Sequence, residues 1–340
     1  MHYRKFSWLS CLIVVVLMGI GCAPKVKTKV LLPAEINLSV YRTVTVIDFE
    51  GATGNWGKRI ASWLEEELIK VKVDDQPYFN VVSRSRLNKI LEEQKLQMTG
   101  LTDPGTSQQI GHLLGVNAII TGIVNTANSR DRSYSRKVTR MVKTPDGKRK
   151  SVQVQEPCIE RKAQVDFSIQ FISVETGKIE VSEAFSHQKV ERACGERKLA
   201  RITSPEKLLI SCAKKAIGKF VRKVVPHYTT VELKLKKKDD SVSGSGKEIT
   251  KLLEIGNKFA ENGDLDGALE RFRTAVNMKP DSPAAHYNLA TILELRGELH
   301  KAREHYESAA RIKPEDDYIK AVAHIQERLT AQEKLKKQLR

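Results

Sequence analysis

Apolar positions in the first half of the chain alternate between the spacing of strands and the spacing of helices. Residues 44–49 and 116–124 are apolar runs rich in β-branched side chains, as buried strands require, and residues 79–83 form a shorter run of the same kind. Apolar residues recur at helical spacing in two other stretches, 60–71 and 87–91, and Asp103-Pro104 marks the start of a third helix that runs to about residue 114. Strands that alternate with helices of this length predict an α/β layer architecture.

The pattern changes after residue 160. Residues 163–171 alternate between apolar and polar side chains, which predicts a strand with one buried and one exposed face, and the turn at 175–177 leads into a returning strand at 179–190. An amphipathic helix at 208–224 and a strand at 229–235 follow. The polar residues that come next contain Gly and Ser, which is typical of a linker.

An internal repeat follows that linker. Eight residues fall at the offsets that tetratricopeptide repeats use for helix packing, and eight equivalent residues follow 34 residues later. The first set is Leu252, Ile255, Gly256, Phe259, Ala268, Phe272, Ala275 and Pro280, and the second is His286, Leu289, Ala290, Leu293, Ala302, Tyr306, Ala309 and Pro314. A last helix, 317–339, is expected to cap the repeats, so that together they form a short groove suited to one peptide or helix.

The first 22 residues have the composition of a secretory signal. Two basic residues precede an apolar run at 6–21, which is too short to span a bilayer comfortably, and Cys22 follows it. This arrangement resembles the signal of bacterial lipoproteins, which implies that Cys22 carries acyl chains such as palmitate and holds the chain on the periplasmic side of the outer membrane. The alternative is a soluble secreted protein whose signal is cut at another residue.

The positive charge is unevenly distributed. The formal net charge is +17, and residues 248–340 hold 16 basic and 16 acidic side chains, so the excess lies before the repeats. An exported chain meets no genome, and the excess therefore points to anionic lipid, a peptidoglycan-associated partner or an acidic protein, and not to nucleic acid. Residues 130–162 contain 11 basic and 4 acidic side chains. We expect a basic hairpin there, turning at 145–147, that touches headgroups or an acidic partner; a solvated loop is the alternative. Its basic side chains are Arg136, Lys137, Arg140, Lys143, Lys148, Arg149 and Lys150.

Four phrases of the first domain together resemble the CsgG family of curli-secretion lipoproteins and the related activators of penicillin-binding proteins. They are VTVIDFEGATGNWG, FNVVSRSRLNKILEEQKLQMTGL, IGHLLGVNAIITG and VDFSIQFISVETGKIEV. The resemblance implies a periplasmic α/β domain, anchored by lipid, that acts by assembling with other proteins and not by catalysis. The predicted parts are a signal peptide at 1–21, a tether at 22–40, a CsgG-like domain at 41–235, a linker at 236–248, and two repeats with a capping helix at 249–340.

The groove of the repeats is the predicted partner site. Repeats that clamp a terminal carboxylate line their groove with asparagines and basic side chains. Asn257 and Asn288 fall at matching places, but Leu253 replaces a lysine, and Tyr318 and Val322 stand where the cap would need basic residues. We therefore expect a more apolar partner segment, with repeat packing as the alternative role of Leu253. The predicted contact residues are Leu253, Asn257, Tyr287, Asn288 and Thr291.

A disulfide between Cys158 and Cys194 is predicted from strand register. A three-residue loop at 175–177 would pair Val174 with Lys178, and paired residues would then have numbers that sum to 352. Cys158 and Cys194 have the same sum, and residues directly opposed on antiparallel strands are close enough to be bridged. A single bulge would shift the sum. Cys212, on the apolar side of its helix, is expected to stay free.

The sequence shows no catalytic, cofactor or metal-binding pattern. The loop 52–59 resembles a phosphate-binding loop, but Ala52 and Arg59 stand where that loop needs Gly and a hydroxyl side chain. HExxH and GxSxG are absent from the sequence. We therefore expect a non-enzymatic outer-membrane lipoprotein of a CsgG-like assembly or secretion system that recruits a protein through its repeats. A regulator of a peptidoglycan synthase and an envelope hydrolase are the alternatives, and whether several copies assemble is left open.

Overall fold

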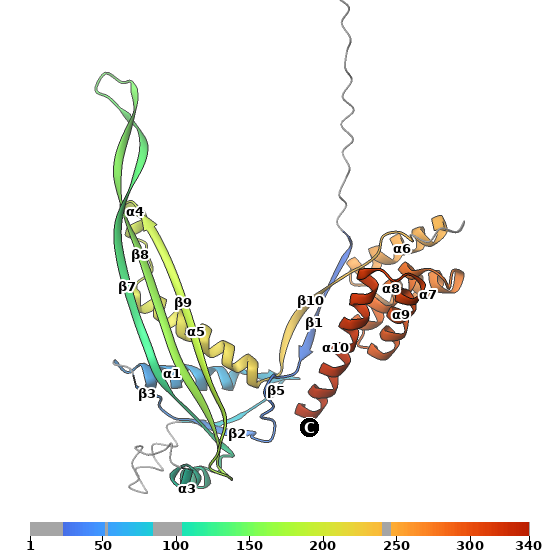
Figure 1. Cartoon of the computed structure of the whole chain (residues 1–340), viewed down its shortest axis with the longest axis horizontal. Helices are drawn as coiled ribbons and strands as arrows, with labels where there is room; N and C mark the ends of the chain where they lie inside the picture. The colour runs from blue at the N-terminus through green and yellow to red at the C-terminus, as the bar shows by residue number, and fades with distance from the viewer. Residues whose placement is uncertain (1–22, 52–53, 84–103, 240–245, 340) are drawn as a thin grey trace, which may run out of the picture. The chain divides into compact units, whose positions relative to one another are not determined.

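The computed structural model describes residues 23–51, 54–83, 104–239 and 246–339. The chain divides into two compact units (Figure 1). One contains the described residues within 31–229 and 331–339, and the other contains those within 23–30 and 230–330. The predicted signal peptide, Cys22 and the helix predicted at 87–91 lie outside the described residues. In the described part of the chain, none of the helices combines the length and the apolar character that a membrane crossing requires.

The first unit is built on a mixed sheet. The elements are β2 (Thr43–Val46), β3 (Glu50–Gly51), α1 (Trp56–Lys70), β4 (Lys72–Val73), β5 (Gln76–Pro77), β6 (Asn80–Val82), α3 (Pro104–Leu114), β7 (Ala118–Lys143), β8 (Arg149–Ser173), β9 (Ile179–Cys194), α4 (Glu196–Leu199) and α5 (Pro205–Val224). The strand order is β6-β2-β7-β8-β9, and β3 pairs with β7 beside this path. β2 runs parallel to β6 and β7, whereas β7, β8 and β9 are antiparallel to one another. The predicted α/β class is confirmed.

The core of this unit lies between the long strands and the helices α1 and α5. Alternate residues of β8 face the helices and are buried, as the period of two along a strand requires. Phe185 on β9 joins both layers, because its ring centroid lies 6.3 Å from that of Phe167 on β8 and 5.7 Å from that of Phe220 on α5. Ser204 caps the start of α5 by accepting a hydrogen bond from the backbone of Lys207. Burial of the helix stripes thus fixes which face of the sheet is the core.

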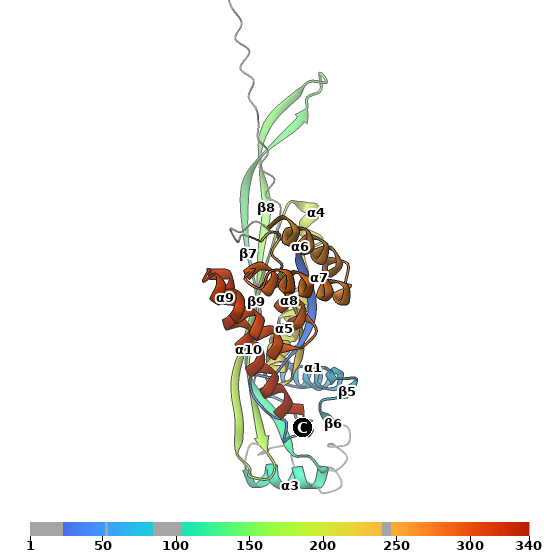
Figure 2. The ribbon, with the colours of Figure 1, turned by 90° about the vertical axis from the view of Figure 1, so that its right-hand side faces the viewer.

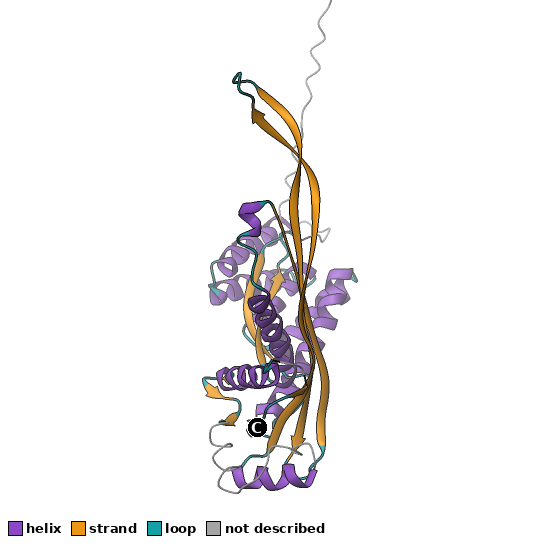
Figure 3. Cartoon of the chain, turned by 90° about the vertical axis from the view of Figure 1, so that its left-hand side faces the viewer, coloured by secondary structure: helices purple, strands orange, loops and turns teal. Residues whose placement is uncertain are grey.

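β7 and β8 continue past the end of β9 as a two-stranded hairpin (Figures 1 and 3). Their register is regular from Ala127 opposite Val165 to Lys143 opposite Arg149. The chain turns through residues 144–148, where Gly147 has a φ of 78° and its N–H donates to the carbonyl of Thr144. The hairpin predicted between residues 130 and 162 is therefore present, with the turn at the expected place.

The second unit contains most of a two-stranded ribbon and the repeat helices up to residue 330. β1 (Lys25–Leu32) pairs with β10 (His227–Lys234). The helices are α6 (Gly246–Glu261), α7 (Leu265–Met278), α8 (Pro283–Leu295), α9 (Leu299–Ile312) and α10 (Asp316–Leu339), and Figure 2 shows them in succession. Gly256 allows the first two helices to approach closely, because a Cβ there would lie 2.4 Å from the ring of Phe272. Gly263 and Gly297, at the turns within the helix pairs, have φ values of 83° and 79°.

Two segments differ from the sequence-based expectation. The region predicted as a tether, residues 22–40, contains strand β1, in which Val26, Thr28 and Val30 alternate with exposed lysines; Val26 is buried and the other two are half-buried. The predicted linker does not begin as a free segment either. Residues 236–239 are held against the repeat helices by hydrogen bonds and an ion pair.

Candidate functional site

The groove of the repeats holds a segment of the chain itself. Two buried asparagines, Asn257 on α6 and Asn288 on α8, bond the backbone of Lys236, which follows β10. The Lys236 N–H donates to Oδ1 of Asn288 over 2.7 Å, and the Lys236 carbonyl accepts from Nδ2 of Asn257 over 3.0 Å and from Nδ2 of Asn288 over 2.9 Å. Asn288 also donates to Oδ1 of Asn257. The two amides thus satisfy both backbone groups of one residue.

The side chain of Lys236 lies between aromatic rings and a carboxylate. Its Nζ is 2.6 Å from Oδ2 of Asp317, 4.8 Å from the ring centroid of Tyr318 and 5.7 Å from that of Tyr287. The ammonium group is attracted to the negative faces of the rings as well as to the acid. The hydrogen bond from Lys236 lowers the pKa of Asp317, and burial raises the pKa of Tyr287 to about 12. The site is therefore preorganised for a cation.

A buried ion pair holds the other end of the same segment. Nζ of Lys279, which follows α7, lies 3.0 Å from Oδ2 of Asp239, and the two side chains are 4% and 0% exposed. The Asp239 N–H donates to Oγ1 of Thr250 on α6. Charges at this depth are kept only when they are paired, and Asp239 supplies a carboxylate to Lys279.

A polar network lies beneath the lysine site. The buried carboxylate of Glu294 on α8 accepts hydrogen bonds from the hydroxyl of Tyr306 over 3.0 Å, from Nε2 of His324 over 2.9 Å and from Nη1 of Arg328 over 3.1 Å. Thr291 bonds the hydroxyl of Tyr306 over 3.1 Å. The bond to Glu294 raises the pKa of His324. This network fixes α9 and α10 against α8, and so fixes the walls of the groove.

A cavity of about 350 Å³ adjoins the Lys236 site. Apolar and aromatic side chains supply most of its wall, and Lys320 and His324 contribute basic groups. The full lining is Ala23, Glu232, Leu233, Lys234, Leu235, Lys236, Tyr287, Tyr306, Asp317, Lys320, Ala321 and His324. The groove therefore holds its own segment beside a cavity that has space for further side chains.

The five predicted contact residues divide into two groups. Asn257, Asn288 and Tyr287 contact Lys236, whereas Leu253 and Thr291 are buried among the helices. Leu253 has the packing role that was the alternative. The segment that the groove holds carries both kinds of side chain, because Leu235 is buried in the core of the repeats whereas Lys236 and Asp239 form ion pairs. Sequence reasoning missed Asp317, Lys279 and Lys236 because their charges are matched only after folding; that a separate partner binds here stays a prediction.

The structure contains the disulfide between Cys158 and Cys194. The two residues are directly opposed on β8 and β9, at the predicted sum of 352. The predicted turn is wrong in detail, since Ser173 and not Val174 bonds Lys178, and the pairing beside the turn is Ile172 with Ile179. A register shift next to this pair restores the sum of 352 for the rest of the ladder. Cys212 is buried and free, as expected.

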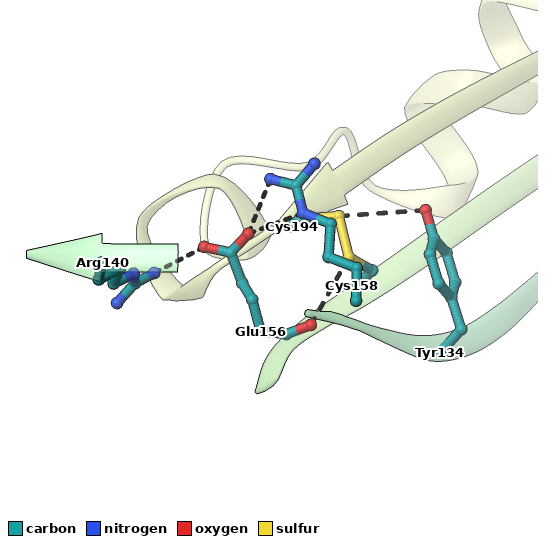
Figure 4. A network of polar contacts seen from close by, with 6 residues as sticks. Tyr134, Arg140, Glu156, Cys158 and Cys194 are labelled. Atoms are coloured by element: carbon teal, nitrogen blue, oxygen red, sulfur yellow. Dashed lines mark hydrogen bonds and ion pairs between the residues drawn. A yellow bond between two sulfur atoms is a disulfide. The ribbon is translucent and has the colours of Figure 1, made fainter. Parts of the chain in front are cut away.

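A second polar cluster surrounds the disulfide at the base of the hairpin (Figure 4). The carboxylate of Glu156 accepts two hydrogen bonds from Arg136, of 2.9 and 2.7 Å, and one of 2.6 Å from Arg140. These bonds lower its pKa, chiefly through Arg136. The Tyr134 hydroxyl lies 4.0 Å from Sγ of Cys194. Two of the seven predicted basic side chains, Arg136 and Arg140, thus share the single negative charge of Glu156. All seven lie at exposed positions of the hairpin, and the other five are Lys137, Lys143, Lys148, Arg149 and Lys150.

In the described ranges, His, Cys, Asp and Glu side chains form no group of three or more that could hold a metal ion. The groove and the hairpin present hydrogen-bonding, aromatic and charged groups. Groups of these kinds can bind polypeptide and anions.

Comparison with known proteins assigns the two units. Residues 32–250 match the family described as curli production assembly/transport component CsgG, which covers more than half of the chain. The chain belongs to the CsgG family. Residues 253–317 of this CsgG-family chain match a tetratricopeptide repeat family. The family resemblance and the repeats that the sequence predicted are confirmed, and together they indicate an envelope protein that acts through protein interaction.

Other similarities are more distant. The human protein O-mannosyl-transferase TMTC1 is 35% identical over 65 residues, which is 19% of this chain and 7% of that protein. A PelC dodecamer from Paraburkholderia phytofirmans has 14% identity and a TM-score of 0.27, with 60% of this chain and 99% of that chain covered. The LpoB C-terminal domain from Escherichia coli has 13% identity and a TM-score of 0.26, with 43% and 82% covered. At these scores the solved structures add nothing to the assignment.

Proposed function

We propose that this CsgG-family chain is a non-enzymatic lipoprotein of the outer membrane, held on the periplasmic side by lipid on Cys22. We further propose that it serves an envelope assembly or secretion system by recruiting a protein partner through its repeats. Family membership and the matched repeats support an envelope role based on protein interaction. The lipobox-like sequence that ends at Cys22 supports the anchor.

One observation carries the recruitment part of the proposal: the two groove asparagines hold a polypeptide backbone. A backbone N–H and C=O are common to almost every residue of every protein, so amides that satisfy both of them bind polypeptide in general. The neighbouring side chains then provide selectivity. A groove built for a small metabolite would instead direct its buried amides toward an enclosed pocket.

A photo-crosslinking residue tests recruitment in living cells. We would place it at Lys320, which borders the cavity and whose side chain is 75% exposed, and as a control at Lys301 on α9, which is 64% exposed and does not line the cavity. The expected result is an adduct with an exported protein at position 320 alone. An absence of adduct at 320, or the same adducts at both positions, would contradict recruitment through the groove. An adduct with a peptidoglycan synthase would favour the alternative role, the regulation of that enzyme.

A further inference from the structure

The segment that occupies the groove defines the chemistry of a ligand. We propose that the groove is a binding site for a peptide in which a lysine is followed three residues later by an aspartate. Residues 236–239 of the chain, Lys-Lys-Lys-Asp, occupy this site in cis, and a partner binds by displacing them with the same pattern. The proposal rests on the recruitment function proposed above and names the class of its ligand.

The first position of the pattern is selected as a lysine. Asp317 pairs with the ammonium group at 2.6 Å while the faces of Tyr318 and Tyr287 lie on the path of the side chain. The ring of Tyr318 is itself buried, so the site keeps its shape. An acidic side chain here would meet Asp317 with the same charge, and an apolar one would lose both the bond to that carboxylate and the attraction of an ammonium group to the two rings.

The fourth position is selected as an acid. Lys279 reaches Asp239 in a region where neither side chain is appreciably exposed, so the pair is screened little by solvent. A neutral or basic side chain at this place would remove the carboxylate that lies 3.0 Å from the buried ammonium group. The two residues between, Lys237 and Lys238, are exposed, and the groove therefore places no comparable demand on them.

Occupation in cis makes the site competitive. A segment joined directly to the repeats acts at an effective concentration in the millimolar range, on the order expected for a short tether. A ligand in solution binds only the fraction of molecules whose groove is open, and its apparent affinity falls by that fraction. A substitution that weakens the contacts of residues 236–239 with the groove should therefore increase the affinity for an added peptide. If the groove had no specificity for this peptide, the affinity would not change.

The test uses a fluorescent peptide with the sequence of residues 232–241, ELKLKKKDDS, and fluorescence anisotropy at 150 mM salt. The full chain carrying Lys236→Ala is expected to bind this probe at least tenfold more tightly than the wild-type chain. A probe with alanine at the positions of Lys236 and Asp239 should bind at least tenfold more weakly. A matched probe with alanine at the positions of Lys237 and Lys238 should bind with an affinity within threefold of that of the unsubstituted probe, although it loses two positive charges.

Groove variants complete the design. In the Lys236→Ala chain, Asp317→Asn should lower the affinity for the probe about tenfold. Asp316→Asn, at a neighbouring side chain that is 88% exposed, should leave this affinity unchanged. Equal binding of the two alanine-substituted probes, or a Lys236→Ala chain that binds no more tightly than wild type, would overturn the proposal. If Lys236→Ala fails to fold, the wild-type chain gives the same comparison between probes at higher concentration. The peptide measurements need no cellular partner. A negative result in them would contradict the proposed peptide pattern but not recruitment, whereas a negative crosslinking result at Lys320 would contradict recruitment but not the peptide pattern.

Discussion

Loss of the disulfide between Cys158 and Cys194 is expected to destabilise the CsgG domain substantially. The bridge closes a chain segment with a sequence separation of 36 residues. A closed loop of that length removes about 13 cal/mol/K of entropy from the unfolded chain, which corresponds to about 3.8 kcal/mol at 25 °C. The double variant Cys158→Ser, Cys194→Ser restores that entropy, so the free energy of unfolding should fall by up to this amount.

Tryptophan fluorescence in urea measures this change in the CsgG domain. Trp56 and Trp63 both lie on α1, whereas the remaining tryptophan, Trp8, belongs to the predicted signal peptide. Their emission therefore reports unfolding of the unit that contains the disulfide and not of the repeats. With a urea slope of about 2 kcal/mol per M, a loss of about 3.8 kcal/mol moves the unfolding midpoint down by about 2 M.

Dithiothreitol provides the matched control. Reduction should lower the midpoint of the wild-type chain by nearly the same amount and should leave the double variant unchanged, since Cys212 is free in both proteins. A reduced wild-type chain whose midpoint moves by less than about 0.3 M would refute the reasoning. That result would mean that the end of β9 opens independently of the domain core and that its crosslink does not contribute to global stability.

Three further predictions concern the anchor and the repeats. Cys22→Ser should release the protein into the soluble periplasm, and a variant that stays in the membrane fraction after a salt wash would contradict the anchor. Glu294 raises the pKa of His324, so His324 stabilises the fold below its unfolded pKa of about 6.5, and this contribution is lost as pH rises through the folded pKa. His324→Gln should therefore lower the melting temperature of the helices more at pH 6 than at pH 8.5. An equal decrease at both pH values would contradict a stabilising role of protonated His324. Gly256→Ala should destabilise the repeats by about 1–3 kcal/mol in circular dichroism melts, because the new methyl group would overlap Phe272; an unchanged melt would show that the helices can separate at little cost.

Local pattern was sufficient for most of the architecture. The period of two at residues 163–171, the helical stripe at 208–224 and the 34-residue repeat each reflect the burial of one face of one element, and burial of a face is recorded in consecutive sequence. The pairing of Cys158 with Cys194 was also predictable, because antiparallel register continues from a turn. The turn between β8 and β9 differs by one residue from the predicted one. The disulfide pairing was nevertheless correct, because a bulge next to the turn restores the predicted register.

The occupant of the groove was decided by tertiary structure. In the sequence, residues 236–239 are a charged stretch after a strand, with the composition of a linker. Their partners are far along the chain: Asn288 is 52 residues from Lys236, Asp317 is 81 residues away, and Lys279 is 40 residues from Asp239. Which charges form pairs depends on how the helices pack. The spacing of residues along a single element does not predict these pairs. The sequence by itself therefore determined the elements and their buried faces, and the folded chain determined what fills the groove.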